Sequence, residues 1–243
     1  MAAFKNKPLT EQVAVITGGG TGIGRAFAAA LAEGGAKAVV IASRRADVLA
    51  ETAAELNRHV GAARVFTYPF DVRDLAQTEA LVRETAARFG TLDILINNSG
   101  LAVPETVEGV TEEGWDKVLD TNLRGAMWLV RAALPYMLRE DFGDVVNVSS
   151  QAGKHGYADV PSYCASKFGL LGYAESLRDH ARKTSANIRV FNLCPGLVDV
   201  ENTGAADEPR PGFIHVRNMA RTLLYLLALD RNVIIEDINI YAR

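Results

Sequence analysis

The sequence predicts an α/β fold with one doubly wound parallel sheet and helices on both faces. Two observations support this prediction. Short apolar runs alternate along the chain with longer segments of helical pattern, beginning with the run at residues 12–17. This alternation is typical of right-handed βαβ crossovers. The runs are also apolar throughout, as expected for parallel strands that are buried on both faces.

The expected elements follow one another in order along the chain. The expected strands cover residues 12–17, 38–42, 64–68, 92–96, 144–148, 188–193 and 235–241. The expected helices run from a glycine cluster to about residue 33, and then over residues 46–60, 74–89, 111–139, 161–183 and 215–229. The sequence has no linker, repeat or low-complexity segment between these elements, so we expect residues 1–243 to form a single domain.

Composition excludes several kinds of protein. The chain has 243 residues, of which 49% are apolar and 23% are charged, and a net charge of -3. Lys and Arg do not cluster, so we expect no nucleic-acid partner. The first twelve residues lack the apolar stretch of a signal peptide, and the apolar helical run at 223–229 is too short to span a bilayer. We therefore expect a cytoplasmic protein without a membrane partner.

Two sequence features have a weaker connection with function. Cys164 and Cys194 are expected to be reduced thiols, and because their spacing is not that of metal ligands we expect no metal site. Residues 201–212 are polar and rich in Gly and Pro, and they follow the carboxyl end of a strand. We expect this segment to be either a plain connector or a lid over a ligand site.

A glycine cluster follows the first expected strand. Residues 17–24 read TGGGTGIG, and a helix is expected to begin within them. Glycines let backbone N–H groups approach a pyrophosphate, and the helix N-terminus adds unpaired N–H groups. The spacing is G-x-x-x-G-x-G, and a tight turn alone also explains it. The position after the first strand of a βαβ unit favours phosphate binding, and with it a Rossmann fold.

The end of the second expected strand indicates which dinucleotide is preferred. NAD-binding chains usually have an acidic residue there, which holds the ribose 2′-hydroxyl. This chain has Ser43 and Arg44 instead, followed by Arg45, whose direction the sequence does not fix. A guanidinium pairs well with a 2′-phosphate, although a solvated charge is the alternative. Asp71 and Val72 are expected to hold the adenine edge, with a helix cap as the alternative for Asp71.

Tyr163 and Lys167 are spaced i, i+4 near the start of an expected helix, so they lie on one face. A free tyrosine has a pKa of about 10. A nearby ammonium favours the phenolate, which makes proton exchange near neutral pH feasible. This spacing alone is common by chance. Three other segments, however, add to this evidence. Residues 97–100 end the fourth expected strand, and Asn122 lies within the long expected helix. Ser149 and Ser150 end a strand at the same carboxyl edge, with strand-end hydroxyls bonded to backbone as the alternative.

Together the motifs TGGGTGIG, NNSG, NLRG, NVSS, YCASK and NLCPG resemble the short-chain dehydrogenase/reductase family, over residues 12–196 and more weakly beyond. The resemblance implies an NADP(H)-dependent oxidoreductase that interconverts a carbonyl and an alcohol by hydride transfer, as a carbonyl reductase or alcohol dehydrogenase. It implies a catalytic tetrad of Asn122, Ser150, Tyr163 and Lys167. Ser150 is preferred to Ser149 because it lies thirteen residues before the tyrosine.

The resemblance also assigns roles. Tyr163 is the general acid and base, Ser150 bonds the substrate oxygen, Lys167 holds the nicotinamide ribose and lowers the pKa of Tyr163, and Asn122 holds a water of the proton relay. The residues implied to bind the cofactor are Gly18, Thr21, Gly22, Ile23, Gly24, Ser43, Arg44, Asp71, Val72, Asn98, Ser99, Gly100, Tyr163, Lys167, Pro195, Gly196 and Val198.

The chain departs from the family pattern at three places. Ser99 replaces an alanine, Val200 replaces a threonine aimed at the nicotinamide, and the C-terminus lacks the usual glycines.

A small-molecule carbonyl or alcohol is the expected substrate. Its candidate pocket residues, placed by their proximity to the motifs, are Leu101, Val103, His155, Tyr157, Leu197 and Val198. An ordinary loop histidine is the alternative for His155.

The family pairs two long helices between subunits, so a homodimer or homotetramer is expected here through residues 111–139 and 161–183. Gly169 and Gly172 lie in the second helix, where close helix approach would explain them.

Two other functions are alternatives. A catalytically idle dinucleotide-binding sensor or scaffold would have a broken tetrad. An epimerase or dehydratase would have a different glycine loop and a larger C-terminal region.

Overall fold

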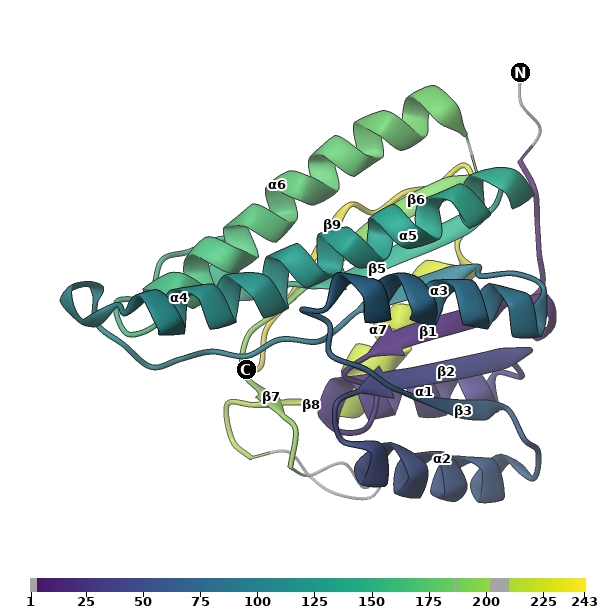
Figure 1. Cartoon of the computed structure of the whole chain (residues 1–243), viewed down its shortest axis with the longest axis horizontal. Coiled ribbons are helices and arrows are strands. Elements are labelled where there is room, and N and C mark those ends of the chain that lie inside the picture. Colours follow the sequence, from purple (N-terminus) through teal and green to yellow (C-terminus); the bar gives the residue numbers. More distant parts are fainter. Residues whose placement is uncertain (1–3, 186, 202–209) are drawn as a thin grey trace.

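The computed structural model describes residues 4–185, 187–201 and 210–243, and over these residues seven strands form one parallel sheet (Figure 1). The strand order is β3-β2-β1-β4-β5-β6-β9. The strands are β1 (Val13–Thr17), β2 (Ala38–Ser43), β3 (Val65–Pro69), β4 (Ile94–Asn97), β5 (Gly143–Val148), β6 (Ile188–Pro195) and β9 (Asp237–Ile240). The order reverses between β1 and β4, which confirms the predicted doubly wound sheet.

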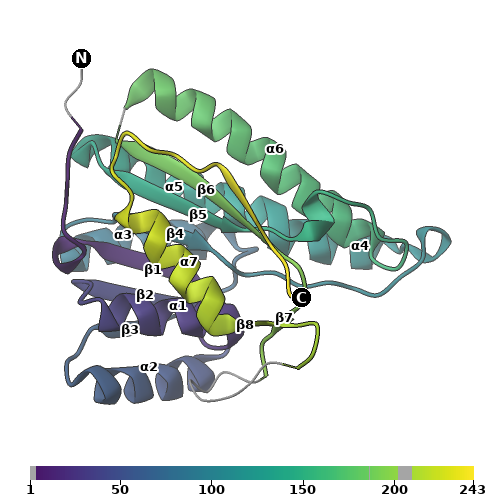
Figure 2. The ribbon, with the colours of Figure 1, turned by 180° about the vertical axis from the view of Figure 1, so that it is seen from behind.

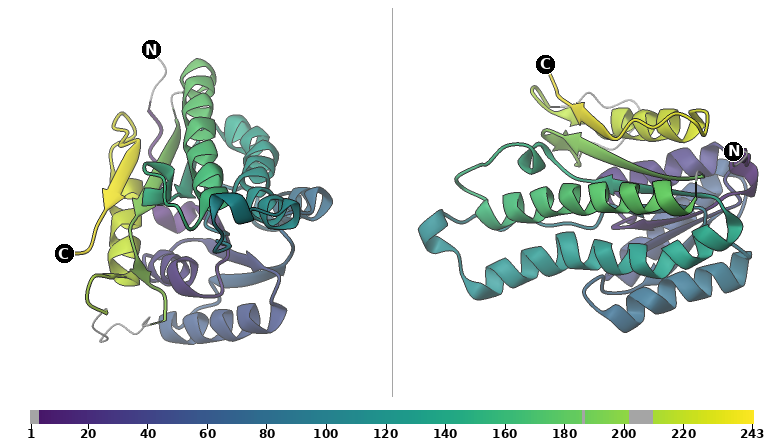
Figure 3. Two further views of the ribbon diagram at one scale, coloured as in Figure 1. Left: turned by 90° about the vertical axis from the view of Figure 1, so that its left-hand side faces the viewer. Right: turned by 90° about the horizontal axis from the view of Figure 1, so that it is seen from above.

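Helices cover both faces of the sheet, as predicted. One face carries α1 (Gly22–Glu33), α2 (Ala46–Val60) and α7 (Val216–Ala228), and Figure 2 shows α1 and α7 in front of the strands. The other carries α3 (Leu75–Phe89), α5 (Gly125–Glu140) and α6 (Pro161–Thr184), with α4 (Glu112–Leu119) beside the start of α6. The layers are visible end-on in Figure 3. Successive strand residues enter opposite cores, Ile16 with α1 and Val15 with α3, because side chains alternate along a strand.

The long helix predicted over residues 111–139 is interrupted. A π-helical turn, Asp120–Arg124, joins α4 to α5. Turns of this kind are rare and are frequent at functional sites. The widened turn contains Asn122, whose side-chain amide bonds the backbone of Leu101 instead of facing its own helix.

Two short strands were not predicted. β7 (Val198–Asp199) and β8 (Ile214–His215) pair in parallel, and each is too short to give an apolar pattern. The segment interpreted as a connector or lid falls mostly outside the described residues, since 202–209 are not described. Within the described part of the chain, no helix combines the length and apolar character needed to cross a membrane.

A row of side-chain amides crosses the sheet near its carboxyl edge. Asn97 donates to Asn147 at 2.9 Å, Asn147 to Asn192 at 2.9 Å, and Asn192 to Asp237 at 2.8 Å. These residues are register partners on β4, β5, β6 and β9. The three asparagines are buried, so their bonds align the four strands from the inside.

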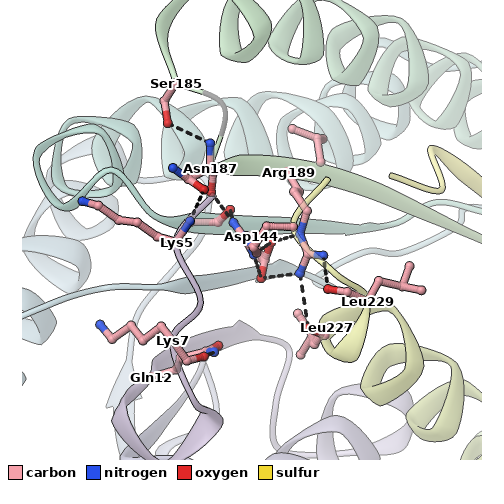
Figure 4. A network of polar contacts seen from close by, with 12 residues as sticks. Lys5, Lys7, Gln12, Asp144, Ser185, Asn187, Arg189, Leu227 and Leu229 are labelled. Carbon is pink, nitrogen blue, oxygen red and sulfur yellow. Dashed lines mark hydrogen bonds and ion pairs between the residues drawn. The ribbon is translucent and has the colours of Figure 1, made fainter. Parts of the chain in front are cut away.

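A buried charge cluster lies at the opposite side of the sheet, near the amino ends of β5 and β6 (Figure 4). The Asp144 carboxylate accepts from Arg189 Nε at 2.8 Å and from Arg231 Nη1 at 2.7 Å. All three side chains are almost fully buried, and burial lowers the pKa of Arg231. Arg189 also donates to the Leu229 carbonyl at 2.9 Å. The cluster therefore ties the end of α7 to β5 and β6.

We expect Asp144→Asn to lower the free energy of unfolding by about 3–5 kcal/mol, because it leaves two buried guanidiniums without their counter-charge. Urea unfolding at pH 7 measures this change. Asp179→Asn is the matched control, since Asp179 forms its ion pair with Lys183 on the exposed surface of α6, and its midpoint should match the wild type. An Asp144→Asn midpoint equal to that of the control would contradict the assignment.

Candidate active site

A cavity of about 630 Å³ opens at the carboxyl edge of the sheet. Eleven of the residues expected to bind the cofactor line it: Gly18, Thr21, Gly22, Ile23, Ser43, Arg44, Asp71, Val72, Asn98, Ser99 and Gly100. The other lining residues are Arg45, Phe70, Arg73, Leu101, Thr121 and Val200. The sequence therefore predicted most of this lining.

The glycine loop forms one wall of the cavity. Gly18 has a φ of 64°, in the left-handed region of backbone conformation that favours glycine. A β-carbon on Gly24 would lie 2.6 Å from Asn98 Nδ2 and would collide with the Gly18 carbonyl. The side chain of Thr21, at the N-cap of α1, caps none of the first N–H groups of that helix. These N–H groups are therefore available to an anion.

Thr17 supports the loop and was missing from the predicted site. Its hydroxyl oxygen accepts from Asn98 N at 3.0 Å and from Ser99 N at 2.9 Å, and its carbonyl accepts from Asn98 Nδ2 at 2.9 Å. Thr17 is 1% exposed. It fastens the end of β4 to the end of β1. The available signal was a hydroxyl at the end of an apolar strand, directly before the glycines.

Three guanidinium groups belong to the cavity lining. They are those of Arg44, Arg45 and Arg73. Arg45 reaches the Thr21 hydroxyl at 3.5 Å, and Arg73 pairs with Asp71 at 2.6 Å. The Arg73 hydrogen bonds hold the pKa of Asp71 below its ordinary value. The helix-cap alternative for Asp71 is wrong, because the N-cap of α3 is Asp74, which accepts from Gln77 N.

Three members of the expected tetrad meet at the start of α6. The Ser150 side chain lies near Tyr163 and lowers the pKa of its phenol. Lys167 Nζ lies 5.5 Å from the centre of the Tyr163 ring and donates to the Val148 carbonyl at 2.8 Å. Ser150 also accepts from Ala152 N at 3.1 Å, which fixes its side chain at the end of β5.

Asn122, the fourth member, connects this group with the cavity. Its amide bonds Leu101 N at 2.9 Å and Leu101 O at 2.8 Å, and donates to Ser166 Oγ at 3.0 Å. A β-carbon on Gly100, which lines the cavity, would lie 3.4 Å from Asn122 Oδ1 and 3.5 Å from Lys167 Nζ. The tetrad therefore borders the cavity at Gly100.

Burial shifts the pKa of both titratable members. It raises the pKa of Tyr163 above 10, and the Ser150 hydrogen bond opposes that rise without cancelling it. Burial lowers the pKa of Lys167 from 10.5 to about 8. The expected lowering of the Tyr163 pKa by Lys167 is therefore not found. Removing water from the phenol outweighs the favourable contacts.

Several expected residues do not line the cavity. Gly24, Tyr163, Lys167, Pro195, Gly196 and Val198 lie outside its lining. Gly196 N instead bonds the Ile240 carbonyl at 2.9 Å, next to the C-terminal strand. Val200 does line it, and its side chain would lie 3.2 Å from a β-carbon on Gly22. Of the candidate substrate-pocket residues only Leu101 lines the described cavity, while His155, Tyr157 and Leu197 are exposed.

This arrangement can be compared with known proteins. Residues 12–211 match the family model for the short chain dehydrogenase. The chain belongs to the short-chain dehydrogenase family. It is therefore an oxidoreductase, and this family uses NAD or NADP as its cofactor. Among the described residues, no group of three His, Cys, Asp or Glu is arranged to hold a metal ion.

Individual relatives support this membership. An uncharacterized oxidoreductase of Staphylococcus aureus (strain USA300) is 31% identical over 96% of this chain and 97% of its own length. The galactitol 2-dehydrogenase of Agrobacterium fabrum is 36% identical over 82% of this chain and 75% of its own. The structure of an alcohol dehydrogenase from Thermococcus sibiricus, complexed with 5-hydroxy-NADP, matches with a TM-score of 0.84 and 27% identity, covering 95% of this chain and 96% of that one.

We expect Lys167 in the cofactor-free protein to titrate near pH 8, which NMR of its side-chain Cε signal measures. Lys154 is the control, since its hydrogen bond with Asp237 raises its pKa above 10.5. The unfolded chain binds more protons than the folded one between about pH 8 and 10, so stability from Lys167 rises with pH there and is lost below that window. If Lys167 titrated together with Lys154, burial would not be lowering the Lys167 pKa.

Proposed function

We propose that this oxidoreductase interconverts a small-molecule carbonyl and its alcohol with NADP(H), and that residues 1–243 act as one cofactor-binding and catalytic domain. The observation that carries the proposal is the group of Ser150, Tyr163, Lys167 and Asn122 at the border of the glycine-lined cavity. The cavity fits a dinucleotide, because its lining combines helix N–H groups that no side chain caps with three guanidinium groups.

The chain's residues divide the work of the reaction. When bound, NADPH supplies the hydride that reduces the carbonyl carbon. Ser150 donates a hydrogen bond to the carbonyl oxygen, and Tyr163 gives that oxygen its proton as the alcohol forms. The raised pKa of Tyr163 keeps the phenol protonated at neutral pH, which suits a proton donor. Lys167 holds the ribose and stabilises the phenolate by its charge, while Asn122 orients a water that returns the proton.

Preference for NADP(H) over NAD(H) rests on the residues after β2. Ser43 and Arg44 line the cavity where an acidic residue would select NAD. Among the lining residues described, Asp71 is the one carboxylate, and Arg73 is already paired with it. The similar alcohol dehydrogenase from Thermococcus sibiricus, complexed with an NADP derivative, supports the same choice.

We also propose a homodimer, with homotetramers as a further assembly, through the outer faces of α5 and α6. Phe168 is 48% exposed on α6. One turn further along, no described atom outside the neighbouring backbone of α6 lies within 4 Å of where a β-carbon on Gly172 would be, which leaves room for a second helix. Gly169 is explained within the chain, because its β-carbon would collide with Leu123 of the π-helical turn.

Tyr163→Phe should reduce kcat by roughly 10²–10⁴-fold, because a phenyl ring has no proton to give. Its dissociation constant for NADPH should remain within a few-fold of the wild type, as cofactor fluorescence titration would measure. Tyr225→Phe is the control, since Tyr225 is exposed on α7. Activity is followed by NADPH absorbance with a panel of ketones and aldehydes. Retention of more than about a tenth of wild-type kcat would refute the role of Tyr163.

Wild-type kcat/KM should favour NADPH over NADH by roughly 10–100-fold, since a charge-assisted hydrogen bond to the 2′-phosphate contributes about 1.5–3 kcal/mol. Arg44→Asp should invert this preference by removing the cation and adding an acceptor for the 2′-hydroxyl. Arg58→Asp makes the same change of charge on α2 outside the cavity, and should leave the ratio unchanged. Equal or better use of NADH by the wild type would overturn the assignment.

The dimer is tested by light scattering at micromolar concentration, where the wild type should have at least twice the monomer mass. Gly172→Arg should give monomers, because it fills the open position on α6 with a long charged side chain. Glu51→Arg on the exposed side of α2 is the control. A monomeric wild type would refute the proposal.

A further inference from the structure

Helix α6, which carries Tyr163 and Lys167, begins without a cap of its own. Its N-cap residue is Val160, an apolar residue that offers no side-chain acceptor, and Pro161 follows at the first helical position. The first N–H groups of a helix have no partner within it and require an acceptor from outside. Proline removes one of those groups. Ser162 is then the first residue of α6 whose N–H needs an acceptor.

Glu105 supplies that acceptor from the loop that follows β4. Its Oε1 accepts from Ser162 N at 3.4 Å and from the Ser162 hydroxyl. The backbone of Glu105 is also bonded to the segment before the helix, since its N–H donates to the Asp159 carbonyl at 2.9 Å. Ser162 is fully buried. Glu105 therefore holds the chain on both sides of the point where α6 begins.

The second carboxylate oxygen of Glu105 lies against the first turn of α4. A β-carbon on Gly114 would be only 3.3 Å from Glu105 Oε2, so glycine makes room for the carboxylate there. Thr111 caps α4 by accepting from Gly114 N at 3.1 Å. The carboxylate thus lies beside the N-terminal ends of two helices, and the positive end of each helix dipole stabilises an anion.

Tyr163 lies between two such attachments. Ser162, the preceding residue, is bonded to Glu105. Ser166 accepts from Asn122 and donates to the Tyr163 carbonyl at 2.7 Å. Asn122 is bonded in turn to Leu101, which belongs to the same loop as Glu105 and follows Gly100 of the cavity lining. The loop that borders the cavity therefore fixes the first turn of α6 at two points.

We propose that Glu105 is a positioning residue for Tyr163: as the external cap of α6 it sets where the tyrosine hydroxyl lies relative to Ser150. This inference rests on the proposed function of Tyr163 in proton transfer. Catalytic rates depend steeply on such placement, since a displacement of about 1 Å can cost roughly 10²-fold. Glu105 acts through the start of the helix and not through contact with the substrate or cofactor.

The test compares Glu105→Ala, Glu105→Gln and Ser162→Ala with the wild type, using NADPH and a carbonyl substrate that the wild type reduces. Glu105→Ala should lower kcat by about tenfold, the effect of losing a cap and misplacing a proton donor, with KM for NADPH changed by less than about twofold. Glu105→Gln should restore most of kcat, because an amide oxygen still accepts both hydrogen bonds. Glu108→Ala is the matched control, an exposed glutamate three residues further along the same loop.

A double-variant cycle tests whether Glu105 acts through Ser162. If the two residues share one function, Glu105→Ala combined with Ser162→Ala should lower kcat no further than Glu105→Ala alone. Additive losses would overturn the proposal. Thermal unfolding of every variant is measured first, and if Glu105→Ala does not fold, the comparison of Glu105→Gln with Ser162→Ala carries the test. Ser162→Ala should then lose about threefold in kcat while Glu105→Gln stays near the wild type.

Hydrogen exchange separates this inference from the proposed function. The Cys164 N–H donates to the Val160 carbonyl at 2.9 Å, the first helical bond of α6. Peptides covering residues 160–167 should exchange faster in Glu105→Ala than in Glu108→Ala or the wild type, whether or not the protein reduces any carbonyl. A wild type without NADPH-linked turnover would refute the proposed function alone. Unchanged exchange in Glu105→Ala, or wild-type kcat in that variant, would refute the role of Glu105.

Discussion

The row of amides across the sheet depends on one charge, the carboxylate of Asp237. A carboxylate only accepts hydrogen bonds. Asn192 must therefore turn its Nδ2 toward Asp237 and its Oδ1 toward Asn147, and the same logic fixes the amide of Asn97. Arg178 holds Asp237 from outside the row at 3.0 Å. Although burial alone would raise it, hydrogen bonds from Lys154, Asn192 and Arg178 keep the pKa of Asp237 below its ordinary value. Burying an amide without its hydrogen bonds is costly, and among the described atoms of the row only Asn97 Oδ1 is without a partner. The row therefore penalises any other alignment of the four strands.

The aligned strand ends lead directly into the candidate site. Asn97 precedes residues 98–100 of the cavity wall, Asn147 comes three residues before Ser150, and Asn192 lies three residues before Pro195. A shift of β5 by one residue would move Ser150 by about 3.3 Å and would turn every side chain of that strand to the opposite face. Such a shift would move Ser150 away from Tyr163, because the two residues come from different elements. The geometry of the site is therefore a consequence of sheet register as much as of the site residues themselves.

The sequence predicted what is local and missed what depends on contacts between distant segments. The strands were predictable because buried parallel strands are apolar throughout, and the glycine loop because its residues are adjacent. The hydrogen bond of Glu105 to Ser162 spans 57 positions, and nothing in either segment alone indicates it. The π-helical turn contains Asn122, whose side chain bonds Leu101 in another segment, and the sequence of the helix alone does not indicate that partner. The pKa of Tyr163 was expected to fall because the residue pattern contains the ammonium of Lys167 but does not contain the burial that outweighs it.

Buried charge is bonded differently at the two ends of the strands, and this difference bears on the proton transfer proposed for Tyr163. At the amino edge, Asp144 and its two arginines are almost fully buried and bonded to one another and to backbone carbonyls, which leaves little room for proton exchange. At the carboxyl edge, Lys167 is buried with one carbonyl partner, and its pKa falls to about 8 as a result. Tyr163 stays neutral for the same reason, because water is excluded without a strong counter-charge taking its place. A hydroxyl oxygen of an incoming group would therefore gain more binding energy by accepting a hydrogen bond from Lys167 than from a lysine whose hydrogen bonds are all made. At the carboxyl ends of the strands, the binding energy of an incoming group can therefore change the protonation state of Lys167. The ordered sheet holds these strand ends in place.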